Sequence, residues 1–539
     1  MSRDFILSGR FGTISSPPAR GSWLYLPAVL VALGMTVPLI YLIIRASSAD
    51  QSVWSWLLRV QTLQIMGQSL LLAVTVMVSA MFFGVLLAWL VTRTDLIGRK
   101  LWAALLPLPL VIPSYVGAYL FVSFFSPRGL LQTLLQTWFG VDRLPSIYGF
   151  WGTWLVLTLL TYPYVFLAVR AVLSRSDRSL EEAARSLGYS PLQTFLKVTL
   201  PQLQPALAAS GLLVGLYVLR DFGAVSILRF TTFTRAIYLQ YQSSIDRSAA
   251  ALLSLVLILI TIGFLAAEQQ FRHSAAEHPH TAVRPAGPIR LGGGQVPALF
   301  AVNLILLIGL VLPAGVLFYW LVRGVAAGEQ LSGWLRPLVG SLSAAGLAAL
   351  ITSLAALPVS ILTVRRSGWF NKVLEKWSYL GYAVPGVVVA LALVFFGANY
   401  LPALYQTLAM LLFAYMILFL PQAMGTLQAS LRQVQRSLEE AAASLGENPL
   451  RVFQRVTLPL MMPGVASAAA LVFLTTMKEL PATLLLAPIG FSTLATQVWA
   501  AVSEAYFARA AAPALILILA SSVSMYLINH HSTQSGSSQ

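Results

Sequence analysis

Long apolar stretches alternate with short polar segments along almost the whole chain, and this pattern predicts a bundle of membrane-spanning helices. About twelve stretches are long enough, since a helix needs roughly 20 apolar residues to cross a bilayer. They cover residues 23–46, 66–92, 101–125, 149–173, 201–228, 248–270, 297–322, 340–364, 377–399, 402–430, 459–488 and 507–528. Several contain proline, which is tolerated in such helices when neighbours supply hydrogen-bond partners.

One polar segment occurs twice in this hydrophobic chain. Residues 180–201 read LEEAARSLGYSPLQTFLKVTLP and residues 438–459 read LEEAAASLGENPLRVFQRVTLP, so 15 of 22 positions agree at a separation of 258 residues. The match extends beyond the segment, because Arg220-Asp221 and Lys478-Glu479 are related by the same separation. Such a repeat indicates a duplicated architecture.

Each copy predicts two short helices joined by a tight turn. In the first copy, Ser179 and Glu182 have the spacing of a capping box, and Gly188 is expected to stop the helix. Ser190 and Pro191 then predict the start of a second helix. The counterparts in the second copy are Ser437, Glu440, Gly446, Asn448 and Pro449.

The first helix of each copy is amphipathic, and a long apolar helix follows the second. Leu180, Ala183, Ala184 and Leu187 recur at helical spacing and share one face. Pro201 and Pro459 are expected to open the long helices. A short helical hairpin held at a fixed angle to a membrane span is typical of a docking element, and the glutamates can cap their own helices at the same time.

Composition supports a polytopic membrane protein of all-α class. The chain has 539 residues, of which 58% are hydrophobic and 10% charged, and its mean hydropathy is +0.79; soluble proteins carry roughly 25% charged residues. The net charge is +16, but the basic residues are scattered between apolar spans, so membrane lipid and not nucleic acid is the expected partner. The chain has no cysteine, which excludes disulfides and thiolate metal sites.

The basic residues also predict the topology. With the N-terminus in the cytoplasm, the six inside segments hold 22 of the 34 lysines and arginines. Both hairpins then lie in the cytoplasm, and two six-span halves are related by an axis along the membrane normal, with the path between them. The stretch after residue 22 is too long for a cleaved signal and is interpreted as a retained first span.

The chain divides at changes in composition. The expected parts are an N-terminal segment with the first helix, a first transmembrane domain, a cytoplasmic linker, the first helix of the second half, a second transmembrane domain and a disordered tail, at 1–60, 61–270, 271–296, 297–336, 337–530 and 531–539. His273, His278 and His280 in the linker are interpreted as part of a flexible, biased segment and not as metal ligands.

Two charged pairs are candidates for the translocation path. Arg220, Asp221, Lys478 and Glu479 follow about 28 Å of predicted helix, which places them near the outer ends of two spans. They form either a charged ring at the outer gate or two neutralising ion pairs at the interface. Tyrosines in the proline-containing spans could offer oxygen atoms to a cation, although tyrosine is common in spans: Tyr115, Tyr119, Tyr162, Tyr164 and Tyr382.

The hairpin sequence resembles the EAA loop of ABC importer permeases. The resemblance implies a type I permease fold duplicated in parallel, working by alternating access, with two copies of a cytoplasmic ATPase on the hairpins. The residues carried over as ATPase-coupling residues are Glu181, Glu182, Ala183, Ala184, Gly188, Glu439, Glu440, Ala441, Ala442 and Gly446. No glycine precedes any of the five lysines, so the chain has no phosphate-binding loop. ATP and magnesium are therefore expected on the partner, with no cofactor on this chain and any metal site unknown.

The segments after the long helices narrow the resemblance. Residues 219–238 (LRDFGAVSILRFTTFTRAIY) and 478–499 (KELPATLLLAPIGFSTLATQVW) are similar to the fused permeases of iron(III) importers. This implies a multi-pass protein of the bacterial inner membrane that works with a periplasmic iron-binding protein and is not itself an enzyme. Thiamine or an oxyanion remains an alternative cargo. An ion-driven secondary transporter, or a scaffold without transport, would leave the repeated hairpin without a role.

Overall fold

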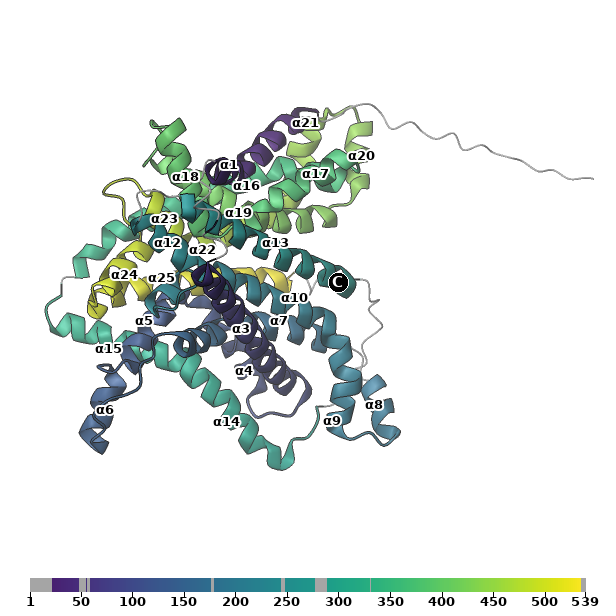
Figure 1. The fold of residues 1–539 in the computed structure, drawn as a ribbon. Helices are drawn as coiled ribbons and strands as arrows, with labels where there is room; N and C mark the ends of the chain where they lie inside the picture. The colour runs from purple at the N-terminus through teal and green to yellow at the C-terminus, as the bar shows by residue number, and fades with distance from the viewer. Residues whose placement is uncertain are drawn as a thin grey trace, which may run out of the picture.

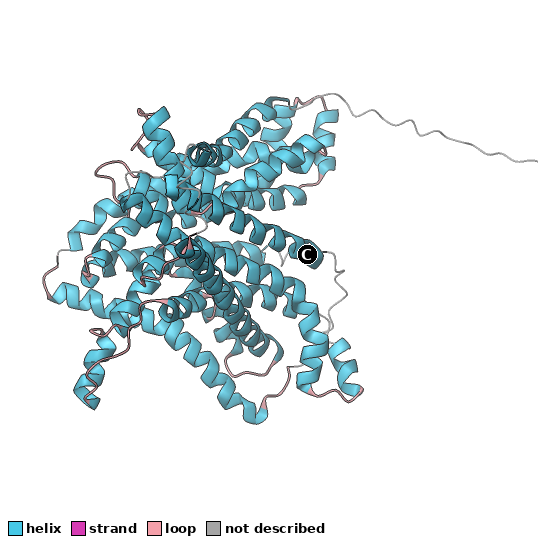
Figure 2. Ribbon diagram, viewed as in Figure 1, coloured by secondary structure: helices cyan, strands magenta, loops and turns pink. Residues whose placement is uncertain are grey.

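The computed structural model describes residues 22–47, 55, 59–175, 179–243, 248–276, 288–329 and 331–534. Almost all of them are helical, and no β-strand occurs in these ranges (Figure 2). The all-α prediction is confirmed. The N-terminal segment, the tail after residue 534 and the linker residues 277–287, which include His278 and His280, lie outside the described ranges.

Nine described helices are long and apolar enough to cross a membrane. Three are built from shorter helices joined end to end: α9–η4–α10, α14–η6–α15 and α21–η9–α22. The nine occupy α1 (Tyr25–Ser47), α3 (Val60–Arg93), α7 (Phe150–Arg175), Pro191–Arg220, α13 (Ser248–Ala276), Gln295–Ala326, α16 (Leu335–Arg365), α19 (Leu408–Gln433) and Pro449–Met477. A shorter apolar helix, α25 (Phe507–Gln534), stands at the last predicted span.

Two predicted spans are broken, which the apolar pattern did not indicate. Helices α4 (Arg99–Leu105) and η3 (Leu108–Val111) meet α5 (Ser114–Phe125) and α6 (Leu130–Phe139) at a bend of 96°. In the second half, α17 (Trp369–Ser378) and η8 (Tyr379–Tyr382) meet α18 (Gly386–Tyr400) at 101°. Pro113 and Pro385 stand at the breaks, because proline lacks an N–H and disfavours helix at the preceding residue.

The two halves have the same internal packing and the same orientation. Helix α3 packs against α7 and against α10 (Leu200–Arg220), while α16 packs against α19 and against α22 (Leu458–Met477). Gly84 permits the close approach of α3 to α7, since an added Cβ would lie 2.6 Å from that of Val165. Figure 1 shows both hairpins on the same side of the bundle, at opposite corners, which fits the predicted parallel repeat.

The first span of each half crosses over to the other half. Helix α1 packs against α16, α17 and α18 as well as against its own α13. Helix α15 (Leu312–Ala326) packs against α5 of the first half as well as against its own α25. The Arg366 guanidinium lies 5.3 Å from the Tyr25 ring, which fixes the start of α1 on the hairpin side. The halves are therefore interlocked.

The end of the linker is ordered against the first half. The side chain of Asp95, in the turn between α3 and α4, accepts a hydrogen bond of 2.8 Å from the backbone N–H of Leu291. Gln295 donates to the same carboxylate at 3.1 Å, and Thr94 forms a β-bridge with Ile289. These contacts hold the start of α14 (Gln295–Leu306) on the hairpin side.

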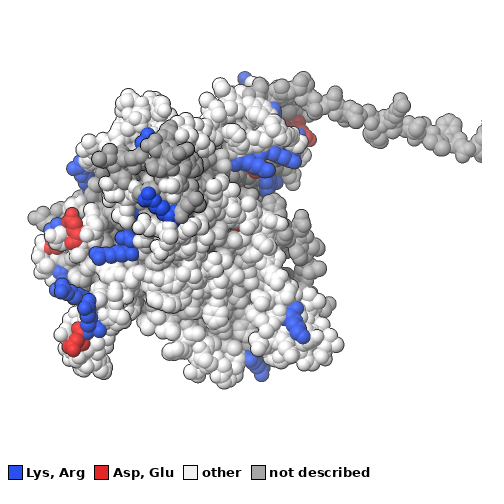
Figure 3. All heavy atoms as spheres, in the orientation of Figure 1, with Lys and Arg blue, Asp and Glu red and all other residues white. Residues whose placement is uncertain are grey.

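The outer surface between α6 and the first hairpin carries few charges. Figure 3 shows a broad uncharged area between these two elements on the face drawn, as expected for a surface turned toward lipid. Large apolar side chains are exposed on the spans that form this surface, for example Leu71, Val78 and Phe82 of α3.

Candidate functional site

The turns of both hairpins have the predicted geometry. Helix α8 (Ser179–Ser186) and helix α20 (Arg436–Ser444) are each followed by a glycine with φ of +87°, at Gly188 and Gly446. The N–H of Tyr189 bonds the Ala184 carbonyl across the first turn. Because only glycine adopts this left-handed conformation without strain, the helix stops are confirmed.

The second helix of each hairpin also starts as predicted. Ser190 accepts a hydrogen bond from the backbone N–H of Gln193, whose side chain bonds back to Ser190, at the start of α9 (Pro191–Thr194). Asn448 accepts one of 2.8 Å from the N–H of Arg451 at the start of α21 (Pro449–Val452). The entry to both helices is therefore fixed by local side chains.

The capping box predicted at Ser437 and Glu440 is wrong. Helix α20 begins one residue earlier, at Arg436, and its N-cap Gln435 makes no side-chain capping bond. Glu440 instead forms an exposed ion pair of 3.2 Å with Arg436, one helical turn away. For the first copy, helix α8 begins at Ser179, and the residues before it lie outside the described ranges.

Each hairpin is continuous with the following span, where the sequence predicted a separate helix opened by proline. A π-helical segment, η4 (Phe195–Thr199), joins α9 to α10 without a break, and η9 (Phe453–Thr457) joins α21 to α22. The fourfold hydrogen-bond pattern is relaxed within these turns while the chain remains helical. A displacement of the hairpin is therefore passed directly into the span.

The first glutamate of each motif is anchored to the bundle. Glu181 lies 3.5 Å from the Arg93 guanidinium at the end of α3 and accepts a hydrogen bond of 3.0 Å from Thr199 of η4. The side chains of Arg93 and Glu181 are 4% and 10% exposed. The carboxylate thus ties three elements of the first half together.

The second half repeats this anchor. Glu439 lies 3.0 Å from the Arg365 guanidinium at the end of α16 and accepts a bond of 3.0 Å from Thr457 of η9. Arg365 also donates to the Val434 carbonyl at 3.0 Å, which fixes the turn before α20. Two buried ion pairs therefore hold the hairpins against their bundles, one in each half.

The remaining motif residues are on the surface. Glu182, Ala183, Glu440 and Ala441 are exposed, whereas Ala184 is buried and Ala442 half-buried. Large apolar side chains stand beside them on both hairpins: Leu180, Leu187 and Leu192 on the first, and Leu438, Leu445 and Leu450 on the second. Leu187 and Leu445 are 79% and 86% exposed. An exposed apolar patch of this kind is typical of a protein-docking surface.

The four charged residues lie where the two long helices end, earlier than the sequence suggested. Helix α10 ends at Arg220 and helix α22 at Met477, and short helices α11 (Gly223–Ile227) and α23 (Pro481–Leu486) follow. Each acidic side chain caps the short helix. Asp221 accepts a bond of 2.9 Å from the Ala224 N–H, and Glu479 accepts one of 3.2 Å from the Ala482 N–H.

The basic side chains reach across to the other half. Arg220 donates to the Tyr382 carbonyl at 3.0 Å, and Lys478 lies 3.5 Å from the Leu110 carbonyl. Both carbonyls belong to the broken spans, and they are separated by 272 residues in the sequence. The arrangement thus repeats about the axis between the halves. The alternative of ion pairs within Arg220-Asp221 and Lys478-Glu479 is not supported, since the acids are engaged with backbone N–H groups.

The tyrosines differ in their partners. Tyr162 donates to the Leu106 carbonyl at 2.8 Å and supports the first broken span. The hydroxyls of Tyr115 and Tyr119 are buried and have no hydrogen-bond partner among the described residues. No group of three or more His, Asp or Glu residues within the described ranges could hold a metal ion.

Comparison with known proteins identifies the family. Residues 80–272 and 348–534 each match the family described as binding-protein-dependent transport system inner membrane component. The chain belongs to this permease family, with two fused copies of its domain. The double match covers both hairpins and both broken spans, and the chain is therefore a multi-pass transport subunit of the inner membrane.

The relatives of this permease include iron and oxyanion systems. It is 38% identical over 516 residues to the Fe(3+)-transport system permease protein FbpB 2 of Haemophilus influenzae, covering 94% of this chain and 98% of that protein. The ferric transport system permease protein FbpB of Actinobacillus pleuropneumoniae is 27% identical, over 78% and 64% of the two chains. The molybdenum transport system permease protein ModB of Escherichia coli is 31% identical, over 33% and 80%.

Proposed function

We propose that this permease imports iron(III) through the inner membrane, with ATP hydrolysed by a separate cytoplasmic ATPase. The duplicated, exposed hairpin carries the ATPase part of the proposal. The cargo is inferred from the relative of matching length, whose name specifies Fe(3+). A periplasmic iron-binding protein would deliver the cargo to the side opposite the hairpins, and the N-terminus and hairpins would lie in the cytoplasm.

Within the hairpins, two roles follow from burial. Glu182, Glu440 and the exposed leucines would contact two copies of the ATPase, which binds the ATP and magnesium. Glu181 and Glu439 would keep each hairpin fixed on its span, so that movement of the ATPase subunits tilts the long helices. An ATPase dimer can shift the permease between conformations only if it binds them with different affinity.

Oxyanion import is the second candidate, since sulfate and molybdenum permeases match one half of the chain. The two are separated by reconstituting the permease with its ATPase and binding protein and measuring uptake of radiolabelled iron(III), sulfate, molybdate and thiamine. We expect ATP-dependent uptake of iron(III) alone. Uptake of an oxyanion without iron would overturn the cargo, and failure of the permease to copurify with any ATPase would overturn the importer class.

A further inference from the structure

We propose that Arg220 and Lys478 form a two-sided latch that keeps an apolar gate closed between the halves while the hairpin side is open. The proposal rests on the proposed import function, because alternating access requires one side of the path to be sealed at a time. It assigns the basic and acidic members of the two charged pairs to different tasks.

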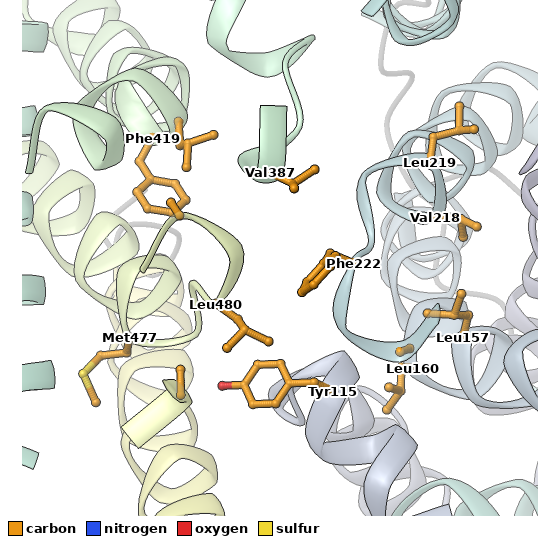
Figure 4. Close-up of a cluster of buried hydrophobic side chains, with 14 of the residues drawn as sticks. Tyr115, Leu157, Leu160, Val218, Leu219, Phe222, Val387, Phe419, Met477 and Leu480 are labelled. Atoms are coloured by element: carbon orange, nitrogen blue, oxygen red, sulfur yellow. The ribbon is translucent and has the colours of Figure 1, made fainter. Parts of the chain in front are cut away.

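The gate consists of four buried side chains on the axis between the halves. Phe222 and Leu480 follow the two long helices and are separated by the 258 residues of the repeat. Tyr115 and Val387 begin the helices after the two breaks and are separated by 272 residues. All four are at most 3% exposed, and Figure 4 shows them directed toward one region from four separate elements. Such a cluster leaves no space for a hydrated cargo.

The latch bonds join the same four segments. Each base stands two residues before the gate residue of its own half, Arg220 before Phe222 and Lys478 before Leu480. Each carbonyl acceptor stands five residues before the gate residue of the opposite half. Separation of the halves at the gate would therefore break both bonds together.

The acids make this geometry possible. Because Asp221 and Glu479 cap α11 and α23, neither holds the base beside it in the sequence. The Glu479 carboxylate instead interacts electrostatically with Arg220 of the other half. Gly386 permits the approach of Glu479, since an added Cβ would lie 2.7 Å from its Oε1. The charged cluster therefore attracts one half to the other.

The hairpin side is open in the same conformation. Helices α10 and α22 pack on helices of their own halves, and the hairpins lie at opposite corners (Figure 1). A hydrogen bond from a charged donor shifts an equilibrium by roughly tenfold or more. Two such bonds would bias the resting permease strongly toward a closed gate, until closure of the ATPase dimer separates the halves on the gate side.

The absence of native cysteine makes the test direct. Arg229→Cys and Ile489→Cys place spin labels on exposed residues in the loops after α11 and α23. The distance between the labels is measured by double electron–electron resonance in the nucleotide-free complex with the ATPase in nanodiscs. The latch variant Arg220→Gln with Lys478→Gln should raise the ratio of long to short distances by at least about tenfold.

Arg170→Gln is the matched control, because Arg170 also donates to a carbonyl, that of Ala103 at 3.1 Å, but within one half. It should leave the distances unchanged, and the exchange Arg220→Lys with Lys478→Arg should restore the short distance. Unchanged distances in the latch variant, or equal opening in the control, would overturn the latch. Should the double variant not fold, Lys478→Gln alone must give a smaller shift in the same direction.

The measurement uses neither cargo nor uptake. A wrong cargo would therefore leave the distances as expected, whereas failure of ATP to lengthen the distance in the parent chain would count against alternating access itself.

Discussion

Glutamine at Glu181 should loosen the first hairpin from its bundle, while glutamine at the neighbouring Glu182 should not. Glu181 is the shared partner of Arg93 and Thr199 in a site where both charged side chains are at most 10% exposed. Removing one member of a buried ion pair costs about 3–5 kcal/mol, because the other charge remains buried. Glu182 is exposed and contacts no such partner in the described structure.

The expected effect is a change in local opening. Since 1.4 kcal/mol corresponds to a factor of ten, Glu181→Gln should raise the fraction of detached hairpin by about two orders of magnitude or more. Hydrogen exchange measured by mass spectrometry over residues 179–199 reports this fraction directly. Exchange over α19, in the other half, serves as the internal reference and should not change.

Coupling should follow the same order with a different cause in each variant. In Glu181→Gln, copurification with the ATPase should weaken together with the loss of protection. In Glu182→Gln, any weakening should occur with normal protection, because only the docking surface is altered. Equal exchange rates in the two variants would refute the division of the motif into an anchoring and a contacting glutamate.

Two further substitutions test backbone positions. Valine at Gly188 or Gly446 should reduce ATPase copurification, since a β-branched residue resists φ of +87°, and normal copurification and transport in both variants would contradict the turn. Gly386→Ala should lower the thermal unfolding temperature of the permease, because the added Cβ meets the Glu479 side chain at 2.7 Å. Gly346→Ala, where nothing lies within 4 Å, should not, and equal effects of the two would argue against close packing at the gate.

Features set by neighbouring residues could be predicted from the sequence. The hairpin turns and the second-helix caps depend on contacts within four residues, and Gly188, Ser190 and Asn448 behave as predicted. The positions of the apolar segments also followed from the pattern. The capping box at Ser437 failed because an ion pair one turn along the helix competes with it, which shifted the helix start by one residue.

Features that join distant segments could not be predicted. Arg93 and Glu181 are 88 residues apart, and a basic residue at the end of a span is equally typical of a membrane boundary. The equal 272-residue separation of Arg93 from Arg365 is a usable signal, because it shows the repeat continuing with a changed spacing. The bends at Pro113 and Pro385 were hidden because average hydropathy is the same for a straight and a broken span.

The exchange of first spans between halves has a consequence for biosynthesis. Helix α1 leaves the ribosome roughly 300 residues before its packing surface on α16 to α18 is complete. At about 5–20 residues per second this delay is of the order of 15–60 s, during which α1 is surrounded by lipid. A chain interrupted at residue 276 would insert, yet it would keep an uncovered flank on α5 and an unplaced α1. Membrane proteases should therefore recognise such fragments, and only translation to the last spans should yield a long-lived product.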